Sequence, residues 1–106
     1  MIRAEFFVRN DSPAGFRISG HAGVSEAGTD IVCAAVSSAA YMTANTITDV
    51  IGVRAEVSAG DGKMFLMLPN EKSAASCGAL LKGFRLHLAS LQEQYPESIT
   101  LTDTEV

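Results

Sequence analysis

The chain lacks any cluster of Lys or Arg. It has 8 basic and 12 acidic residues, for a formal net charge of −4. Proteins that bind nucleic acid without sequence specificity draw most of their affinity from Lys and Arg that neutralise phosphates. A negative surface attracts a basic polypeptide instead, although solubility explains four net charges equally well. We therefore expect no direct nucleic-acid partner.

Signals for export and for membrane insertion are also missing. The first residues, Met1 to Asp11, carry charges every few positions and lack the apolar core and cleavage site of a secretory signal. No run approaches the roughly 20 apolar residues that span a bilayer. The sequence thus predicts a cytoplasmic protein with no membrane partner.

Cysteine is scarce, with Cys33 and Cys77 as the only two. A structural disulfide between them is not expected in the reducing cytosol, so at least one is a candidate for chemistry. The two cysteines and two histidines do not have the spacing of zinc ligands. We therefore expect no metal and no other cofactor.

Length and apolar patterning predict one α+β domain over residues 1–106. Alternation of apolar and polar residues, broken by turn residues, predicts four strands: residues 2–8, 16–19, 52–58 and 63–68. Helical spacing of apolar residues predicts one helix over 31–49 and a second that Asn70 or Ser73 caps and Pro96 ends.

The end of the chain completes the predicted sheet. Ile99 and Leu101 indicate a short last strand, and residues 103–106 have the character of a tail. The order strand, strand, helix, strand, strand, helix, strand favours two helices packed on a mostly antiparallel sheet of about five strands. The run Met64 to Leu68 is apolar on both faces, so it is either a strand covered on both sides or part of a subunit interface.

One pair of residues is placed for nucleophilic chemistry. His21 follows a predicted strand, and Cys33 lies near the start of the predicted helix, after a loop of small residues. If Asp30 is the N-cap, Cys33 is the third helical residue, where free backbone N–H groups and the helix dipole stabilise a thiolate. The loop is long enough for His21 to reach Cys33. A His–Cys pair is the smallest set of residues that can attack a carbonyl in this way. The imidazole takes the thiol proton and later protonates the leaving amine.

The residues around this pair each have two interpretations. Asp30 either caps the helix, which is favoured, or orients His21. Ser37, one turn after Cys33, either hydrogen-bonds near the thiol or is a small residue that lets the helix approach the sheet. The pair itself also has a structural interpretation, because a lone His is commonly solvated and a Cys among Ala and Val is commonly a core residue. Cys77 fits core packing better than chemistry.

The segments Ser19–Gly23 and Gly28–Ser37 together resemble the signature of the ribosomal-processing cysteine protease family, Prp. The resemblance implies an endopeptidase with His21 as general base and Cys33 as nucleophile. Further positions are implied in support of the site: Gly20, Asp30 and Ser37. The loop implied to order on substrate binding contains four small residues: Ala22, Gly23, Gly28 and Thr29.

The resemblance also implies a substrate and an assembly. Members of the family remove a short N-terminal extension from the large-subunit ribosomal protein numbered twenty-seven, cutting after a pair of Phe residues and before a small residue. The resemblance further implies that members of the family form homodimers. The expected partners of this chain are therefore the N-terminal segment of that ribosomal protein and a second copy of itself.

Two other classes of function compete with this one. The first is a non-catalytic, ribosome-associated binding module that keeps the fold and holds a basic partner on its acidic surface. The second is a thiol redox or acyl-transfer protein that uses Cys33. It lacks a nearby resolving cysteine, because Cys77 belongs to the other predicted helix.

Overall fold

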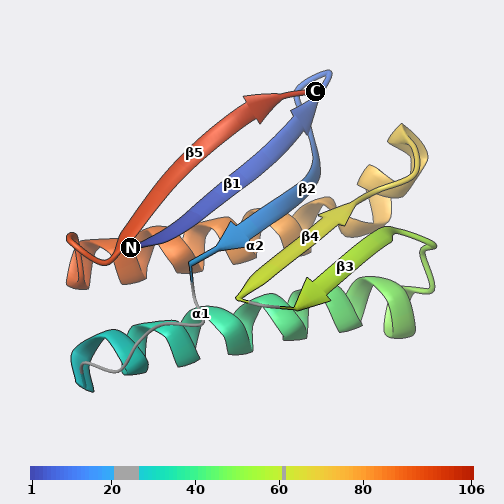
Figure 1. Ribbon diagram of the computed structural model, residues 1–106. Helices are drawn as coiled ribbons and strands as arrows, with labels where there is room; N and C mark the ends of the chain where they lie inside the picture. The colour runs from blue at the N-terminus through green and yellow to red at the C-terminus, as the bar shows by residue number, and fades with distance from the viewer. Residues whose placement is uncertain (21–26, 61) are drawn as a thin grey trace.

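The computed structural model describes residues 1–20, 27–60 and 62–106, with 27–30 described through their backbone. Eight elements follow one another along the chain (Figure 1): β1 (Ile2–Arg9), β2 (Ser12–Ser19), α1 (Ala27–Asn45), the π-helix η1 (Thr46–Ile51), β3 (Glu56–Gly60), β4 (Lys63–Met67), α2 (Glu71–Gln94) and β5 (Ile99–Glu105). The predicted α+β order of strands and helices is confirmed.

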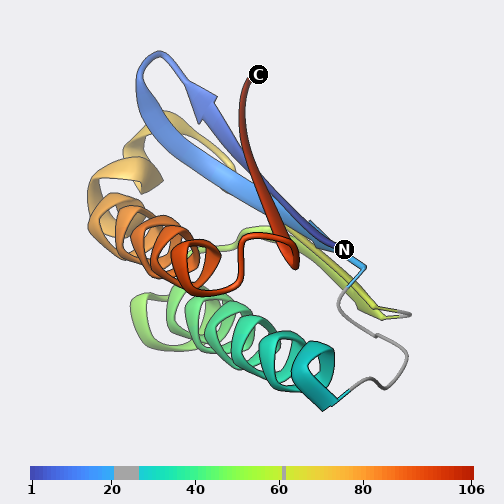
Figure 2. The same cartoon turned by 90° about the vertical axis from the view of Figure 1, so that its left-hand side faces the viewer.

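The strands form one mixed sheet in the order β3-β4-β2-β1-β5. Neighbouring strands are antiparallel, except that β1 and β5 are parallel. Both helices lie on the same face of the sheet, and within the described parts of the chain the other face carries no helix (Figure 2). The predicted two-layer arrangement on a mostly antiparallel sheet is therefore confirmed.

Aromatic side chains fix α2 against the middle of the sheet. The ring of Phe84, on α2, meets Phe6 of β1 at 5.5 Å and Phe16 of β2 at 4.9 Å between centroids, both edge to face. All three rings are buried. Such pairs contribute about 0.5–1.5 kcal/mol each beyond their burial. The side chain of Asn70 also accepts a hydrogen bond from the backbone N–H of Ser73 at 3.0 Å, which caps the start of α2.

The last strand is longer than predicted. β5 continues to Glu105, through residues whose sequence indicated a tail. Asp103 accepts two hydrogen bonds from the Arg85 guanidinium on α2, at 2.8 and 2.6 Å. The N–H of Val106 donates to the carbonyl of Val8 on β1 at 2.9 Å. These contacts hold the segment in the sheet, so the tail prediction is wrong. β3 likewise differs from its prediction, since it begins only at Glu56.

The first helix is longer than predicted at both ends. It begins at Ala27 and continues through η1 to Ile51, where Gly52 with φ 81° ends it. The segment Ile31–Ile51 is long and apolar enough to cross a membrane by length and composition, with a mean hydropathy of 1.2, which corrects the sequence prediction. Core helices meet the same criterion, and Val32 of this segment is fully buried against the sheet.

Strand β4 is apolar on both faces, but the helices cover only one of them. Met64 and Leu66 point into the core and are 1% and 0% exposed. Phe65 and Met67 lie on the opposite face and are half-buried. The prediction that both sides of this strand are covered within one chain is therefore wrong for the described residues, and the subunit interface stays a prediction.

Candidate active site

Cys33 lies one turn further into the helix than the sequence predicted. Because α1 begins at Ala27, Asp30 is inside the first turn and does not precede the helix, so its predicted role as N-cap is wrong. Gly28 and Thr29, predicted to be loop residues, are also helical. Gly and Thr have low helix propensity, which favoured the loop, but propensity is a weak prior that the surrounding fold overrides. The predicted loop therefore ends before Ala27.

This shift separates Cys33 from the free end of the helix. Only the first four N–H groups of a helix lack an intrahelical partner, and here these belong to residues 27–30. Cys33 is the seventh helical residue. The predicted position of its thiol among the free N–H groups is therefore wrong.

The Cys33 side chain is almost closed off from solvent. It is 6% exposed and belongs to the same core cluster as its neighbours Val32 and Val36. Cys77, on α2, is 0% exposed, and the thiols of both cysteines are free. Burial therefore fits a core role for both, and in this state Cys33 presents little surface to a peptide carbonyl.

The other predicted site residues are only partly described. Gly20, at the end of β2, has φ 81°. Ser37 is half-buried on α1, one turn after Cys33. His21, Ala22 and Gly23 lie outside the described residues, so the contact between His21 and Cys33 stays a prediction. Among the residues that the structure describes, there is no group of three or more His, Cys, Asp or Glu side chains that could hold a metal ion.

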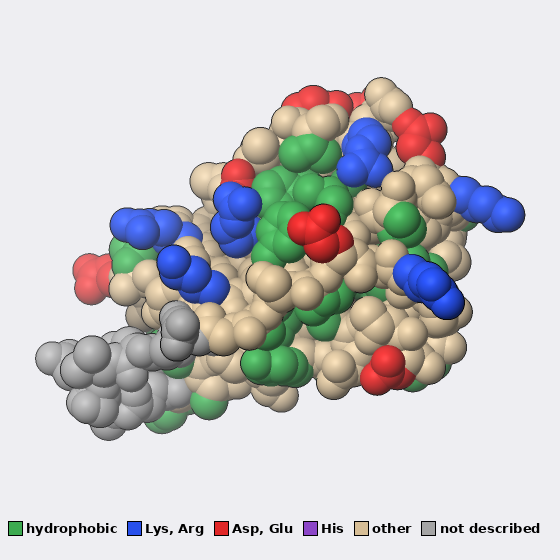
Figure 3. Space-filling view, turned by 45° about the vertical axis from the view of Figure 1, so that its right-hand side comes forward, with side chains coloured by type: hydrophobic (Ala, Val, Ile, Leu, Met, Phe, Trp, Pro, Cys, Tyr) green, Lys and Arg blue, Asp and Glu red, His purple; other side chains and the backbone are tan. Residues whose placement is uncertain are grey.

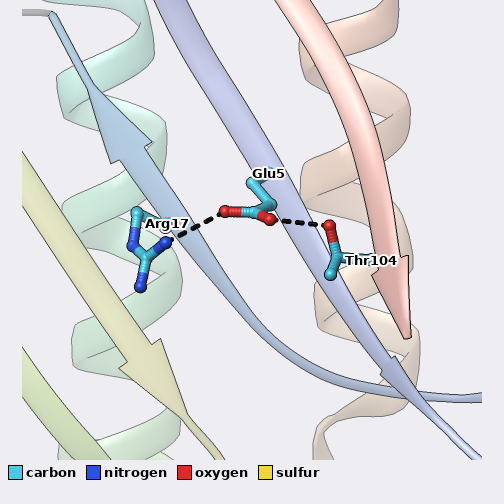
Figure 4. Close-up of polar contacts among 3 residues, drawn as sticks. All are labelled: Glu5, Arg17 and Thr104. Carbon is cyan, nitrogen blue, oxygen red and sulfur yellow. Dashed lines mark hydrogen bonds and ion pairs between the residues drawn. The ribbon is translucent and has the colours of Figure 1, made fainter. Parts of the chain in front are cut away.

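A polar network that was not predicted from the sequence lies on the uncovered face of the sheet. Arg17 of β2 donates to Glu5 of β1 at 3.2 Å, and the hydroxyl of Thr104 on β5 donates to the other Glu5 oxygen at 2.6 Å (Figure 4). The Arg17 guanidinium also lies 5.5 Å from the ring centroid of Phe7 and 5.6 Å from that of Phe65. Alternation along each strand places these residues on one face, but the strand order that unites them is not visible in the sequence.

This face combines apolar and charged side chains. Figure 3 shows a hydrophobic patch with Lys and Arg side chains beside it. Two hollows of about 350 Å³ each lie on either side of Arg17, one lined by Arg3 and Ser19 and the other by Lys63 and Phe65. We call the surface around Phe7, Arg17 and Phe65 the open face.

The chain matches one known protein family over most of its length. The family model described as cysteine protease Prp matches residues 1–100. The chain therefore belongs to the Prp family and is a cysteine protease. The resemblance seen in the sequence is thus confirmed.

Solved structures agree with the fold. SMU.848 from Streptococcus mutans is 30% identical, with a TM-score of 0.83, and the match covers 100% of this chain and 96% of that one. The essential ribosomal processing protease Prp from S. aureus, in complex with a substrate peptide, has a TM-score of 0.87 at 23% identity, over 98% of this chain and 100% of that one. At that identity the likeness shows the fold alone. None of the curated proteins compared with the chain matches it.

Proposed function

We propose that this chain is an endopeptidase that removes a short N-terminal extension from the large-subunit ribosomal protein numbered twenty-seven. The cut follows a pair of Phe residues and precedes a small residue. The family match over residues 1–100 carries this proposal. The S. aureus protease, named for ribosomal processing and solved with a substrate peptide, supports a peptide substrate. We further propose that residues 1–106 act as one cytoplasmic protease domain, with no nucleic acid or membrane as partner.

The proposed chemistry uses His21 and Cys33. His21 takes the thiol proton, the Cys33 sulfur attacks the carbonyl carbon, and the peptide C–N bond breaks as His21 returns the proton to the leaving amine. Water then hydrolyses the thioester and restores the free thiol. Because Cys33 is nearly closed off, we propose that its sulfur becomes accessible when substrate binds, together with the ordering of the loop that the resemblance implies around Ala22 and Gly23.

Asp30, Ser37 and Gly20 are the residues proposed to support the catalytic pair. Asp30 lies within α1, so the role that remains for it is to orient His21. Ser37 lies one turn from Cys33 on the same helix, and its proposed role is to hydrogen-bond near the thiol. Gly20 precedes the proposed base directly.

We propose that the open face joins two copies of the chain. It presents the half-buried ring of Phe65, which lies 5.8 Å from the buried ring of Phe7 between centroids, and Arg17 and Glu5 give it charges of both signs, as in a surface that contacts its own copy. Phe65→Glu should convert the dimer to a monomer in light scattering at micromolar concentration. Leu86→Glu, at a 68% exposed position on α2, is the matched control and should leave it a dimer. A monomeric wild type would overturn this proposal.

The direct test of the activity is mass spectrometry of the extended ribosomal protein after incubation with the enzyme. Wild type should cleave it after the Phe pair, while Cys33→Ala and His21→Ala should not. Cleavage by all three would assign the activity to other residues or to a contaminant. A folded wild type that cleaves nothing would contradict the proposed function.

One observation favours a second candidate, the non-catalytic binding module. The 6% exposure of Cys33 is what a core cysteine would show. This alternative predicts binding of the ribosomal protein that weakens with salt and is unchanged in Cys33→Ala, without any cleavage.

A further inference from the structure

Strand β3 leaves one edge of the sheet open. Among the described strands it pairs with β4 alone, and each of its five residues is exposed. A strand at a sheet edge presents N–H and C=O groups that can pair with another extended chain. Lys, Pro and bulges usually prevent such pairing, but β3 contains neither residue and its register with β4 is continuous. This edge therefore has the backbone groups that an added strand needs.

The register with β4 indicates which residues of β3 turn these groups outward. Gly60 pairs with Lys63, with two residues between them, and such a closing pair directs its hydrogen bonds inward. Because backbone groups alternate along an antiparallel strand, those of Val57 and Ala59 point away from β4. Val57 is opposite Leu66, a core residue, so its side chain lies on the helix side of the sheet. It is nevertheless 41% exposed, which leaves apolar surface beside the outward backbone groups.

Cys33 lies on the flank of α1 that is turned toward this edge. Ala39 and Met42 of α1 line the hollow toward α2. At 3.6 residues per turn, Cys33 is rotated about 120° from Ala39 and about 180° from Met42 around the helix. Figures 1 and 2 show α1 beside β3 and β4, whereas α2 lies beside β1, β2 and β5. The proposed nucleophile is therefore on the β3 side of α1.

The opposite edge of the sheet, formed by β5, is a poorer template for an added strand. It carries two acidic residues, Asp103 and Glu105, and charged side chains at an edge discourage pairing. The carbonyl of Ile99 already accepts a hydrogen bond from the side-chain amide of Gln92 on α2 at 3.1 Å. β5 also lies on the α2 side of the sheet, away from Cys33. The two edges therefore differ in both chemistry and position.

We propose that β3 binds the peptide substrate as an added strand. The inference rests on the proposed function, because it takes a peptide as the occupant and Cys33 as the nucleophile. Main-chain hydrogen bonds to Val57 and Ala59 hold the peptide extended, and every second peptide side chain packs on the helix side against Val57. Adjacent residues of a strand point to opposite faces, so one ring of a Phe pair lies on that side. The peptide backbone then runs along the side of the sheet on which Cys33 lies.

Val57→Lys tests this assignment with a charge that opposes strand addition. KM for a synthetic peptide that contains a Phe pair followed by Ala should rise about tenfold, the effect of losing one apolar contact of this size, and kcat should change little. Val50→Lys is the matched control, because it makes the same change at a 79% exposed position on η1, and it should keep the KM of wild type. An unchanged KM in folded Val57→Lys would overturn the assignment, while cleavage by wild type would keep the proposed function.

Hydrogen exchange in Cys33→Ala gives a second measurement that does not depend on cleavage. Saturating amounts of the same peptide should slow amide exchange at Val57 and Ala59 and leave β5 unchanged. Absence of protection on β3, or protection of β5 alone, would overturn the assignment. Protection of β3 that grows with protein concentration without peptide would overturn it in favour of a second copy. If folded wild type cleaves no substrate, the proposed function fails, but protection of β3 by the peptide would still identify this edge as the peptide-binding strand.

Discussion

The two helices lie on one face of the sheet but are anchored to it differently. α2 meets β1 and β2 through three aromatic rings and β5 through the Arg85–Asp103 ion pair. α1 presents small side chains to α2, and a hollow of about 710 Å³ lies between the two helices. Both helices carry one buried cysteine. The α2 side therefore supplies stability, and the more lightly anchored α1 side carries the residue that the family resemblance assigns to chemistry.

Replacement of the two cysteines should separate these roles most sharply. Cys33→Ala should reduce cleavage by about a million-fold, because loss of the nucleophile removes the whole covalent route. Cys77→Ala is the matched control, with the same atoms removed from a comparable buried site, and should retain cleavage. The assay is peptide cleavage at equal folded concentration. Equal activity in the two variants would mean that Cys33 is only a core residue.

The anchoring of α2 predicts the largest loss of stability. Phe84→Ala should lower the free energy of unfolding by about 3–5 kcal/mol, because it removes a buried ring that contacts both Phe6 and Phe16. Urea denaturation measures this change. Leu86→Ala, at an exposed position on the same helix, should stay within about 0.5 kcal/mol of wild type. A loss below 1 kcal/mol at position 84 would contradict the role given to the aromatic cluster.

A smaller loss is expected for the buried cysteine of α2. Cys77→Ala should cost about 1 kcal/mol, since it removes one sulfur atom from a closed core and leaves a small cavity. This corresponds to a decrease in Tm of roughly 4–8 °C in a domain of this size. Scanning calorimetry checks the value. An unchanged Tm would show that the core around α2 collapses to fill the space.

The Arg85–Asp103 pair should give the smallest effect and a defined pH dependence. The hydrogen bond from Arg85 lowers the pKa of the Asp103 carboxyl below its ordinary value, against a weaker opposing effect of desolvation. The contribution to stability is therefore present above the ordinary pKa of about 4 and is lost as pH falls through the lower folded value. Both side chains are exposed, 41% and 47%, so screening limits the pair to about 0.2–1 kcal/mol.

Urea denaturation of wild type and Asp103→Asn checks this dependence. The difference between the two proteins should be measurable at pH 7, shrink as the carboxylate is protonated on acidification below its ordinary pKa, and shrink in high salt. A difference that is constant across pH would assign the effect to packing and not to charge.

The sequence predicted the order of elements because apolar periodicity is strong in most of them. It failed where polar residues concealed the pattern. In β5 the outward positions are Thr100, Thr102 and Thr104, and the acidic Asp103 between them suggested a tail, whereas its partner Arg85 comes from a distant helix. The parallel pairing of β1 with β5 depends on tertiary structure, so no local pattern in the sequence indicates it.

The sequence predicted which residues form the candidate site but not the helix boundary or the burial of its cysteine. The spacing of His21 and Cys33, with the family signature around them, predicts the pair, and the contact between the two side chains stays a prediction. The start of α1 was placed wrongly because Gly28 has low helix propensity. The burial of Cys33 was not predictable, because a cysteine among Ala and Val fits a core position and a reactive one equally well. Position 20 also has no room for a side chain, because a Cβ there would lie 2.4 Å from the carbonyl oxygen of Met1, which only the fold brings beside it.

The pairing of β1 with β5 also affects how the chain folds. Ile2 pairs with Ile99, so this ladder joins two segments that lie far apart in the sequence. Contacts between opposite ends of a chain raise contact order and slow folding. Until β5 arrives, the edge of β1 is unpaired and open to other strands, which is a route to aggregation. The sheet is therefore complete only once β5 has been synthesised, and removal of β5 should leave a chain that is prone to aggregation.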